Sequence, residues 1–455
     1  MTNQFRYIIL VSFIGILLWL RSMPVLADDA SLGRAPDGVY PLADAAVVMT
    51  DEDVKVKLLE NGTTAEVTCD FTFYNDGAAK DVLMGFPASQ KVSVESEVQS
   101  GAMELRDFKA FIDGQSTAVK TENGSVPAHI ALPPGTEYDR WYTFTVPFQA
   151  GETRQVRNTY RVKNLFYSNG EVVAGYILRT GAFWKDPVGH ARVTFDLGEI
   201  KPYQINRLYP NCYRFAGNTL VFERENFEPS YDLEITFDNY HYSAGFLNNA
   251  SDDTKEKING KINLFTELEG KLAELAGAGE AEIRAVYNAA VAANDPFTAQ
   301  FVASRLPAGA IKQEPPTISA VEVKNESGDF YRVSAKVRDP NADFTFWEIR
   351  VIREENGKKI IDLSDRRRFL QATYDDELAY GLSLEPGKQY WIEFEVWDAD
   401  DHADRQAVTY RSGDAVPQVI ASARTINSKW LFAPLGMCAM VAAAVAWRRS
   451  RHFSG

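Results

Sequence analysis

The apolar stretch near the C-terminal end constrains the architecture of this chain more than any other feature. No residue between Trp430 and Trp447 is charged, and three arginines follow directly: Arg448, Arg449 and Arg451. As an α-helix, this stretch would be about 27 Å long, close to the roughly 30 Å of a bilayer's hydrocarbon core. Tryptophans favour the headgroup level and arginines mark the cytoplasmic side. The pattern predicts one membrane-spanning helix over residues 430–447, with residues 448–455 as a cytosolic tail.

The first 27 residues predict export of everything that precedes this helix. Arg6 supplies a positive start, an apolar run covers residues 7–20, and Ala27 suits a signal-peptidase site. We therefore expect residues 1–27 to be a signal peptide, with an uncleaved signal anchor as the alternative. Either reading places the protein in the cell membrane with a large domain outside.

The charge of the chain limits its partners. The formal net charge is −14 at pH 7, and nucleic acid or anionic lipid would need a basic surface instead. We therefore expect no nucleic-acid partner. Hydrophobic residues make up 45% of the chain, which is enough for packed cores rather than a disordered stalk.

Residues 28–245 show the alternation of β-strands. Apolar residues recur at every second position from Val54 to Leu58 and again from Val67 to Phe73, with Asn61-Gly62 as a hairpin turn between them. Short strands with regular turns and no helical intervals indicate antiparallel β-sandwiches. Whether residues 28–245 form one large sandwich or two smaller ones stays open.

Several short motifs in this region resemble an uncharacterised family of bacterial surface ectodomains. They are Met49-Thr50-Asp51-Glu52-Asp53-Val54, Phe71-Thr72-Phe73-Tyr74-Asn75, Met84-Gly85-Phe86-Pro87, Gly151-Glu152-Thr153 and Leu178-Arg179-Thr180-Gly181. The resemblance covers about two fifths of the chain. It implies an exported bacterial β-domain and brings no known activity.

Over residues 251–306, apolar residues recur with the period of an α-helix instead of that of a strand. An apolar stripe at spacings of three and four residues predicts a first helix. A second is expected over 280–293, and Asp295 and Pro296 suit the N-cap and first position of a third. We interpret this segment as a helical spacer that packs on the β-domain, with a partner-binding surface as the alternative.

Residues 315–413 predict a second sandwich. Seven expected strands in about a hundred residues fit an immunoglobulin-like domain. The run Leu384-Glu385-Pro386-Gly387-Lys388-Gln389-Tyr390 resembles fibronectin type III domains, which implies that Tyr390 bonds back to the preceding corner. Trp347 on the third strand departs from that pattern, so a more general immunoglobulin-like domain is the alternative. Residues 414–429 are expected to be a polar tether.

Two sets of side chains are candidate sites. Cys69 and Cys212 both face the oxidising side of the membrane, and the sequence leaves open whether they form a disulfide. Two acidic loops, 339–343 and 398–404, share one end of an immunoglobulin-like sandwich. Their carboxylates predict a Ca²⁺ site, although residues suited to turns are the simpler reading; they are Asp339, Asp343, Asp398, Asp400 and Asp404.

No catalytic motif accompanies these candidates. The histidines have no zinc-site spacing, and the chain has neither a G-x-S-x-G elbow nor a glycine-rich phosphate loop opening a helix. We therefore expect that the protein is not an enzyme and that it binds no cofactor other than Ca²⁺. The favoured hypothesis is a membrane-anchored bacterial protein whose β-sandwiches bind a protein or glycan of the envelope. The alternatives are an exported hydrolase with two acidic residues in the N-terminal domain, and a receptor-like sensor that needs a partner subunit.

Overall fold

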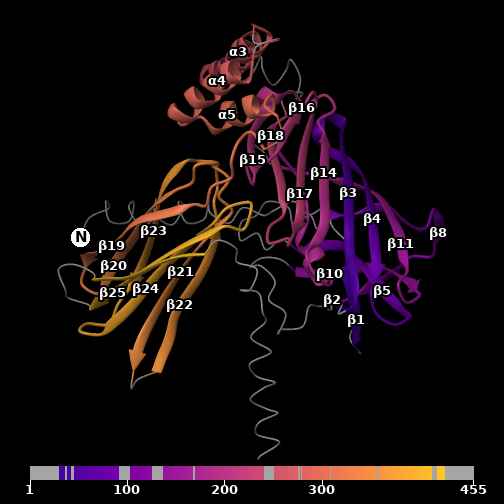
Figure 1. Ribbon diagram of the computed structural model, residues 1–455, viewed down its shortest axis with the longest axis horizontal. Helices are drawn as coiled ribbons and strands as arrows, with labels where there is room; N and C mark the ends of the chain where they lie inside the picture. The colour runs from indigo at the N-terminus through magenta and orange to yellow at the C-terminus, as the bar shows by residue number, and fades with distance from the viewer. Residues whose placement is uncertain are drawn as a thin grey trace, which may run out of the picture.

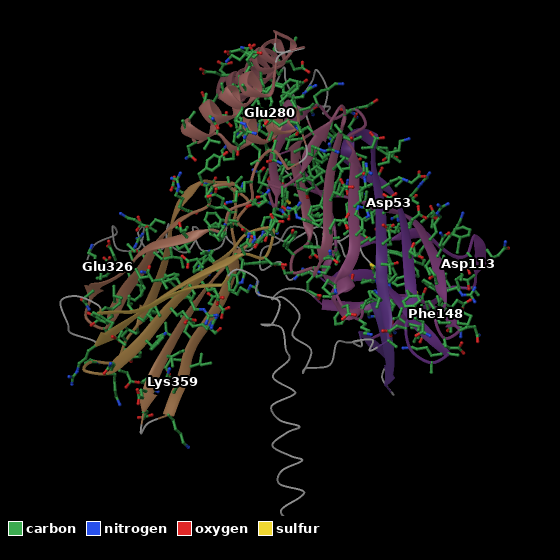
Figure 2. All side chains as sticks on the ribbon, in the orientation of Figure 1. Asp53, Asp113, Phe148, Glu280, Glu326 and Lys359 are labelled. Carbon is green, nitrogen blue, oxygen red and sulfur yellow. The ribbon has the colours of Figure 1, made fainter. Side chains whose placement is uncertain are left out.

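The described part of the chain has two β units, with three α-helices lying above the place where they meet (Figure 1). The computed structural model describes residues 30–35, 38–41, 46–91, 103–124, 137–167, 170–239, 251–274, 277, 279–307, 309–355, 358–411 and 418–425. We call residues 30–239 the N-terminal β domain, 251–307 the helical segment and 317–425 the C-terminal sandwich. Figure 2 labels Asp53, Glu280 and Lys359 in these three parts, respectively. Strands dominate, as the sequence predicts.

The N-terminal β domain contains three sheets. The largest has the order β16-β17-β14-β3-β4-β11-β7-β8, with bounds β3 Val47–Leu59, β4 Thr64–Asn75, β7 Arg106–Ile112, β8 Gln115–Thr117, β11 Thr153–Lys163, β14 Val188–Asp196, β16 Arg214–Ala216 and β17 Thr219–Phe227. The second has the order β2-β1-β5-β10-β9, with β6 beside β5: β1 Ala30–Ala35, β2 Gly38–Pro41, β5 Lys80–Lys91, β6 Met103–Glu104, β9 Lys120–Asn123 and β10 Glu137–Phe148. The third has the order β12-β13-β18-β15: β12 Leu165–Phe166, β13 Glu171–Tyr176, β15 Ile205–Tyr209 and β18 Leu233–Asp238.

One hydrophobic core joins all three sheets of the N-terminal β domain. Buried residues from β3, β5, β13 and β18 belong to the same packed cluster. The sheets are antiparallel except at one place, because β14 pairs with β3 in parallel. No local pattern predicts this pairing, since more than a hundred residues separate the two strands.

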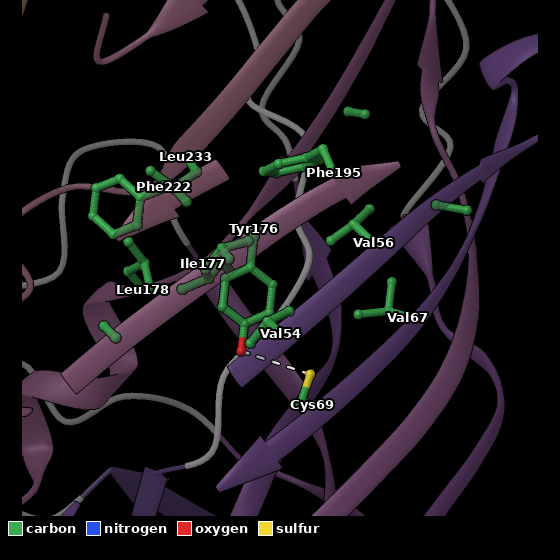
Figure 3. Packing of buried hydrophobic residues seen from close by; sticks show 14 of the residues in the cluster. Val54, Val56, Val67, Cys69, Tyr176, Ile177, Leu178, Phe195, Phe222 and Leu233 are labelled. Carbon is green, nitrogen blue, oxygen red and sulfur yellow. Dashed lines mark hydrogen bonds between the residues drawn. The ribbon is translucent and has the colours of Figure 1, made fainter. Parts of the chain in front are cut away.

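Strand β3 shows how sequence alternation builds this core. A register shift between Met49 and Asp51 inserts one extra residue against β4, which moves the buried face from odd to even positions. Glu52 therefore points inward together with Val54. The buried Tyr176 of β13 reaches this layer, where its hydroxyl donates to Glu52 Oε1 at 3.0 Å. Figure 3 shows the same hydroxyl pointing to Cys69, whose Sγ lies 3.7 Å away.

The helical segment is close to its prediction. It consists of α3 Asp252–Glu274, α4 Glu280–Ala292 and α5 Pro296–Ala303. Asp295 caps α5, since its side chain accepts from the backbone N–H of Thr298 at 3.0 Å. Phe265 of α3 and Phe301 of α5 are buried in the core of the N-terminal β domain. The helices therefore pack on that domain, as expected of the spacer.

The C-terminal sandwich has sheets of three and five strands, in the orders β19-β20-β23 and β22-β21-β24-β25-β26. The bounds are β19 Thr317–Ser327, β20 Phe330–Arg338, β21 Phe346–Glu355, β22 Lys358–Arg368, β23 Asp375–Ser383, β24 Gln389–Trp397, β25 Ala403–Arg411 and β26 Gln418–Thr425. The hydroxyl of Tyr390 accepts from the backbone N–H of Glu385 at 2.9 Å, the corner bond that the fibronectin-like resemblance implies. Trp347 lies in the core, 5% exposed.

The C-terminal part of the chain differs from its prediction in one respect, and its predicted membrane helix is not described. Strand β26 occupies part of the segment that we expected to be a polar tether, so the sandwich has eight strands rather than seven. None of the helices in the described residues combines the length and the apolar character that a membrane crossing requires. The signal peptide 1–27, the predicted span 430–447 and the tail 448–455 all lie outside the described residues.

Candidate functional site at the domain junction

The two β units meet around a buried carboxylate. Glu234 of β18 is 4% exposed, and its Oε2 accepts from Arg368 of β22 at 2.9 Å. Arg207 of β15 pairs with Oε1 of the same carboxylate, and the Arg368 guanidinium lies 4.2 Å from the ring centre of Tyr209. Burial acts to raise the pKa of Glu234, but the two arginines outweigh it and the pKa is lowered. The acid is therefore held in its charged form.

Hydrogen bonds to backbone carbonyls fix how the two units dock. The Tyr209 hydroxyl donates to the carbonyl of Thr345 at 3.0 Å, and the Tyr231 hydroxyl donates to the carbonyl of Ala399 at 2.6 Å. Both tyrosines are buried. Because buried hydroxyls and carbonyls need partners, separating the units would leave these groups unsatisfied unless water replaced them. The junction is thus specified by geometry as well as by charge.

The two acidic loops predicted from sequence lie at this junction. Asp339 accepts from the backbone N–H groups of Asn341 at 2.8 Å and Asp343 at 3.0 Å. Asp398 accepts from the N–H groups of Asp400 at 2.9 Å and His402 at 2.8 Å. These bonds shape each loop from within, which is the role of turn residues that sequence analysis gave as the simpler reading.

The carboxylates of the two loops influence one another. Burial raises the pKa of Asp339 to about 6 and raises that of Asp343 well above its usual value, with Asp398 adding repulsion to both. The guanidinium of Arg224, from β17 of the N-terminal β domain, ion-pairs with Asp400 at 3.1 Å. The positive charge of Arg224, a residue of the N-terminal β domain, therefore lies against the acidic loops of the C-terminal sandwich. Asp404 has a different role, since it accepts from the N–H of Ile318 at 2.7 Å.

The predicted calcium site receives no support from the arrangement of these side chains. Within the ranges that the structure describes, no three His, Cys, Asp or Glu side chains are placed to hold one metal ion. The loops lie close together, and Asp339 and Asp398 accept from backbone N–H groups while Asp400 pairs with Arg224. Among the described residues, Asp343 Oδ1 and Asp400 Oδ2 are buried without a hydrogen-bond partner. Binding of Ca²⁺ stays a prediction.

Cys69 and Cys212 are not joined by a disulfide in the structure. Cys69 lies in β4 on the buried face beside Tyr176, whereas Cys212 lies in the connection between β15 and β16. Burial raises the pKa of the Cys212 thiol to about 12, although Arg224 acts in the opposite direction. The disulfide that the sequence left open is therefore not formed.

A cavity of about 380 Å³ opens between the helical segment and the C-terminal sandwich. We call it the junction pocket. Its volume lies in the range of about 300–1,000 Å³ that is usual for small-molecule sites, which often occur where domains meet. Its walls include side chains from both sides: Tyr287, Asn288 and Val291 from α4, and Arg338, Tyr374 and Asp375 from the sandwich.

Sequence analysis did not identify this pocket. Tyr287 and Val291 fit an ordinary apolar helix face. Tyr374 lies between β22 and β23 and belongs to no motif. The sequence contains one indication of it: a helical segment is predicted between two β domains, and its surfaces can therefore contact both.

The comparisons with known proteins give no family. No family model and no curated protein matches the chain. Among solved structures, a proposed nutrient binding protein from Legionella pneumophila matches over 50% of this chain and 78% of its own, with 19% identity and a TM-score of 0.34. Yeast LTA4 hydrolase matches over 45% of this chain and 31% of its own, with 10% identity and a TM-score of 0.25. OgpA from Akkermansia muciniphila matches over 25% and 31%, with 12% identity and a TM-score of 0.19. Likenesses this weak assign neither a fold nor an activity.

One prediction is corrected by these matches. Sequence analysis expected that the protein is not an enzyme, on the ground that catalytic motifs are missing. A hydrolase is nevertheless among the structures that the chain matches, so missing motifs do not exclude an enzyme. The same matches establish no enzymatic activity, because their TM-scores are low.

Proposed function

We propose that the protein is an exported binding protein tethered to the membrane, and that the junction pocket is its ligand site. The single observation that carries this proposal is the pocket of about 380 Å³ built from two different parts of the chain. The predicted span 430–447 supplies the tether. The ligand is a small molecule, or the terminal group of a glycan or protein in the envelope.

The rigidity of the junction supports this role. The pocket's two walls belong to the helical segment and the C-terminal sandwich, and both are fixed to the N-terminal β domain. Phe301 of α5 is buried in that domain's core, while Glu234 and Arg368 join the domain to the sandwich. A site whose walls are held in place before the ligand arrives loses less entropy on binding.

A thermal-melting screen of the full chain in detergent tests the proposal. The compounds are amines, saccharides and carboxylic acids at millimolar concentration, because a ligand bound only by the folded state raises the melting temperature. Val291→Trp fills the pocket, and Leu264→Trp places the same side chain on α3, where Leu264 is 54% exposed.

We expect at least one compound class to stabilise the wild-type chain and the Leu264→Trp variant, but not Val291→Trp. The melting of each variant without ligand shows whether it is folded. The proposal fails if no class stabilises the wild type, or if a folded Val291→Trp variant keeps the full shift.

A further inference from the structure

We propose that the junction pocket binds a small organic cation, an amine or a quaternary ammonium group. This inference rests on the proposed function, because it names the ligand class of the same site. Three features of the pocket carry it: the aromatic walls, the helix end that opens onto them, and the balance of nearby charges.

Two tyrosine rings line the pocket from separate elements. Tyr287 belongs to α4, and Tyr374 directly precedes β23. Tyr374 is 4% exposed and packs in a small cluster with Ala290, Ala299 and Ala342, which holds its ring in place. An aromatic face attracts a cation within about 6 Å of the ring centre, and aromatic walls are a general means of binding quaternary ammonium groups.

The C-terminal end of α4 opens onto the same space. Ala292, the last residue of α4, and Asn294 just beyond it both line the pocket. The carbonyl groups at this end of a helix carry a partial negative charge, which favours a cation and disfavours an anion. Asn294 has a positive φ of 54°, and the chain turns sharply here, with the N–H groups of Asn294 and Asp295 donating to the carbonyls of Val291 and Ala290.

The charged side chains around the pocket leave a negative balance. Arg338 is neutralised by Asp375, whose two carboxylate oxygens each lie 3.1 Å from its Nη1. Arg284 pairs with Glu280 on the same helix. Asp295 and Asp339 do not line the pocket and accept backbone N–H bonds, but both lie close enough to act on Tyr374: burial raises the pKa of its hydroxyl, and Tyr287 and the two carboxylates raise it further.

These features separate a cation from the other classes of small ligand. An anion would face the helix end and the field of two carboxylates behind the pocket wall, with the pocket's arginine already paired. A neutral saccharide could bond to Asn288 and to the tyrosine hydroxyls, but it would gain nothing from the negative potential. A compact cation gains from the potential and from both rings.

A matched pair of probes tests the charge alone. Choline and 3,3-dimethylbutan-1-ol have nearly the same shape, but only choline is charged. We expect the full chain in detergent to bind choline about tenfold more tightly, as measured by calorimetric titration at constant ionic strength. Glucose and acetate serve as the neutral and anionic comparisons.

A pair of variants tests the rings. Tyr374→Phe keeps the aromatic face and should hold the choline affinity within about threefold, whereas Tyr374→Leu should weaken it about tenfold. Tyr287→Leu repeats the test at a partly exposed position if Tyr374→Leu does not fold.

Each outcome bears on the inference. Tighter binding of choline that depends on the rings supports it. Equal binding of the uncharged analogue, preferred binding of glucose or acetate, or no binding of choline overturns it. If glucose or acetate binds and Val291→Trp abolishes that binding, the proposed function stands with another ligand class.

Discussion

The carboxylate of Glu234 accepts a hydrogen bond from Arg368 at 2.9 Å, although 134 residues separate the two in the chain. Glu234 belongs to the N-terminal β domain and Arg368 to the C-terminal sandwich. Both side chains are largely withdrawn from solvent. This ion pair joins the two β units. The walls of the junction pocket come from the helical segment and the C-terminal sandwich, so their relative position depends on how the units dock.

Removing the shared carboxylate should destabilise the whole protein. Glu234→Ala leaves Arg207 and Arg368 without their partner in a buried place, which should lower the free energy of unfolding by about 3–5 kcal/mol. Urea unfolding followed by tryptophan fluorescence measures it. Glu225→Ala, an exposed acid on β17, is the matched control and should change stability by less than about 0.5 kcal/mol. Equal effects of the two substitutions would show that the junction pair is not important for stability.

The acidic loops should make stability depend on pH. Asp339 and Asp343 have a raised pKa in the folded protein, so the folded state binds more protons than the unfolded state once the pH rises above their usual value near 3.8. Stability from these groups is complete below that value. It falls as the pH rises towards about 6, the pKa that burial gives Asp339.

Asp343→Asn tests this effect, because the amide resembles the protonated acid. We expect the variant to be more stable than the wild type at pH 7.5 and equal to it at pH 4, as measured by urea unfolding at each pH. Asp81→Asn, an exposed acid on β5, should show no such difference. A gain that is the same at both pH values would indicate a packing effect instead of a titration.

Much of the fold follows from local patterns, whereas the junction does not. The alternation in β3 and β4, the capped start of α5 at Asp295 and the corner bond of Tyr390 are all set by residues close in sequence. The parallel pairing of β14 with β3 and the meeting of Glu234 with Arg368 depend on contacts between distant segments. No periodicity encodes such contacts.

The candidate site shows the same division. Sequence analysis placed the acidic loops together, because immunoglobulin-like topology brings them to one end of the sandwich. It missed Arg224, which arrives from the other domain, and it missed the junction pocket, whose walls become neighbours only after the domains dock.

A variant that lacks the Arg224 side chain gives the best test of the predicted calcium binding. Arg224→Gln removes the cation that pairs with Asp400 and should lower the free energy of unfolding by about 3–5 kcal/mol at pH 7.5. We expect millimolar Ca²⁺ to restore part of this loss relative to chelator, because the freed carboxylates repel one another and oxygen ligands suit Ca²⁺. Equal melting of the variant in Ca²⁺ and in chelator would rule out calcium binding by these loops.

The predicted orientation in the membrane rests on the arginines after Trp447. A cysteine placed at Ser454 should resist an impermeant thiol reagent in intact cells, because arginine clusters remain on the cytoplasmic side. Glu322→Cys, at an exposed position of β19, should react readily and provides the comparison. Equal labelling of the two sites would show that the predicted topology is wrong.

Hydrogen exchange with bound ligand tests the central claim most directly, because it locates the site. The full chain is compared with and without the compound that stabilises it most in the melting screen, and peptides are analysed for amide protection. The account predicts new protection in α4 around Tyr287–Asn294 and in the segments that contain Arg338 and Tyr374. Protection confined to the strands of the N-terminal β domain, or no protection at all, would contradict it.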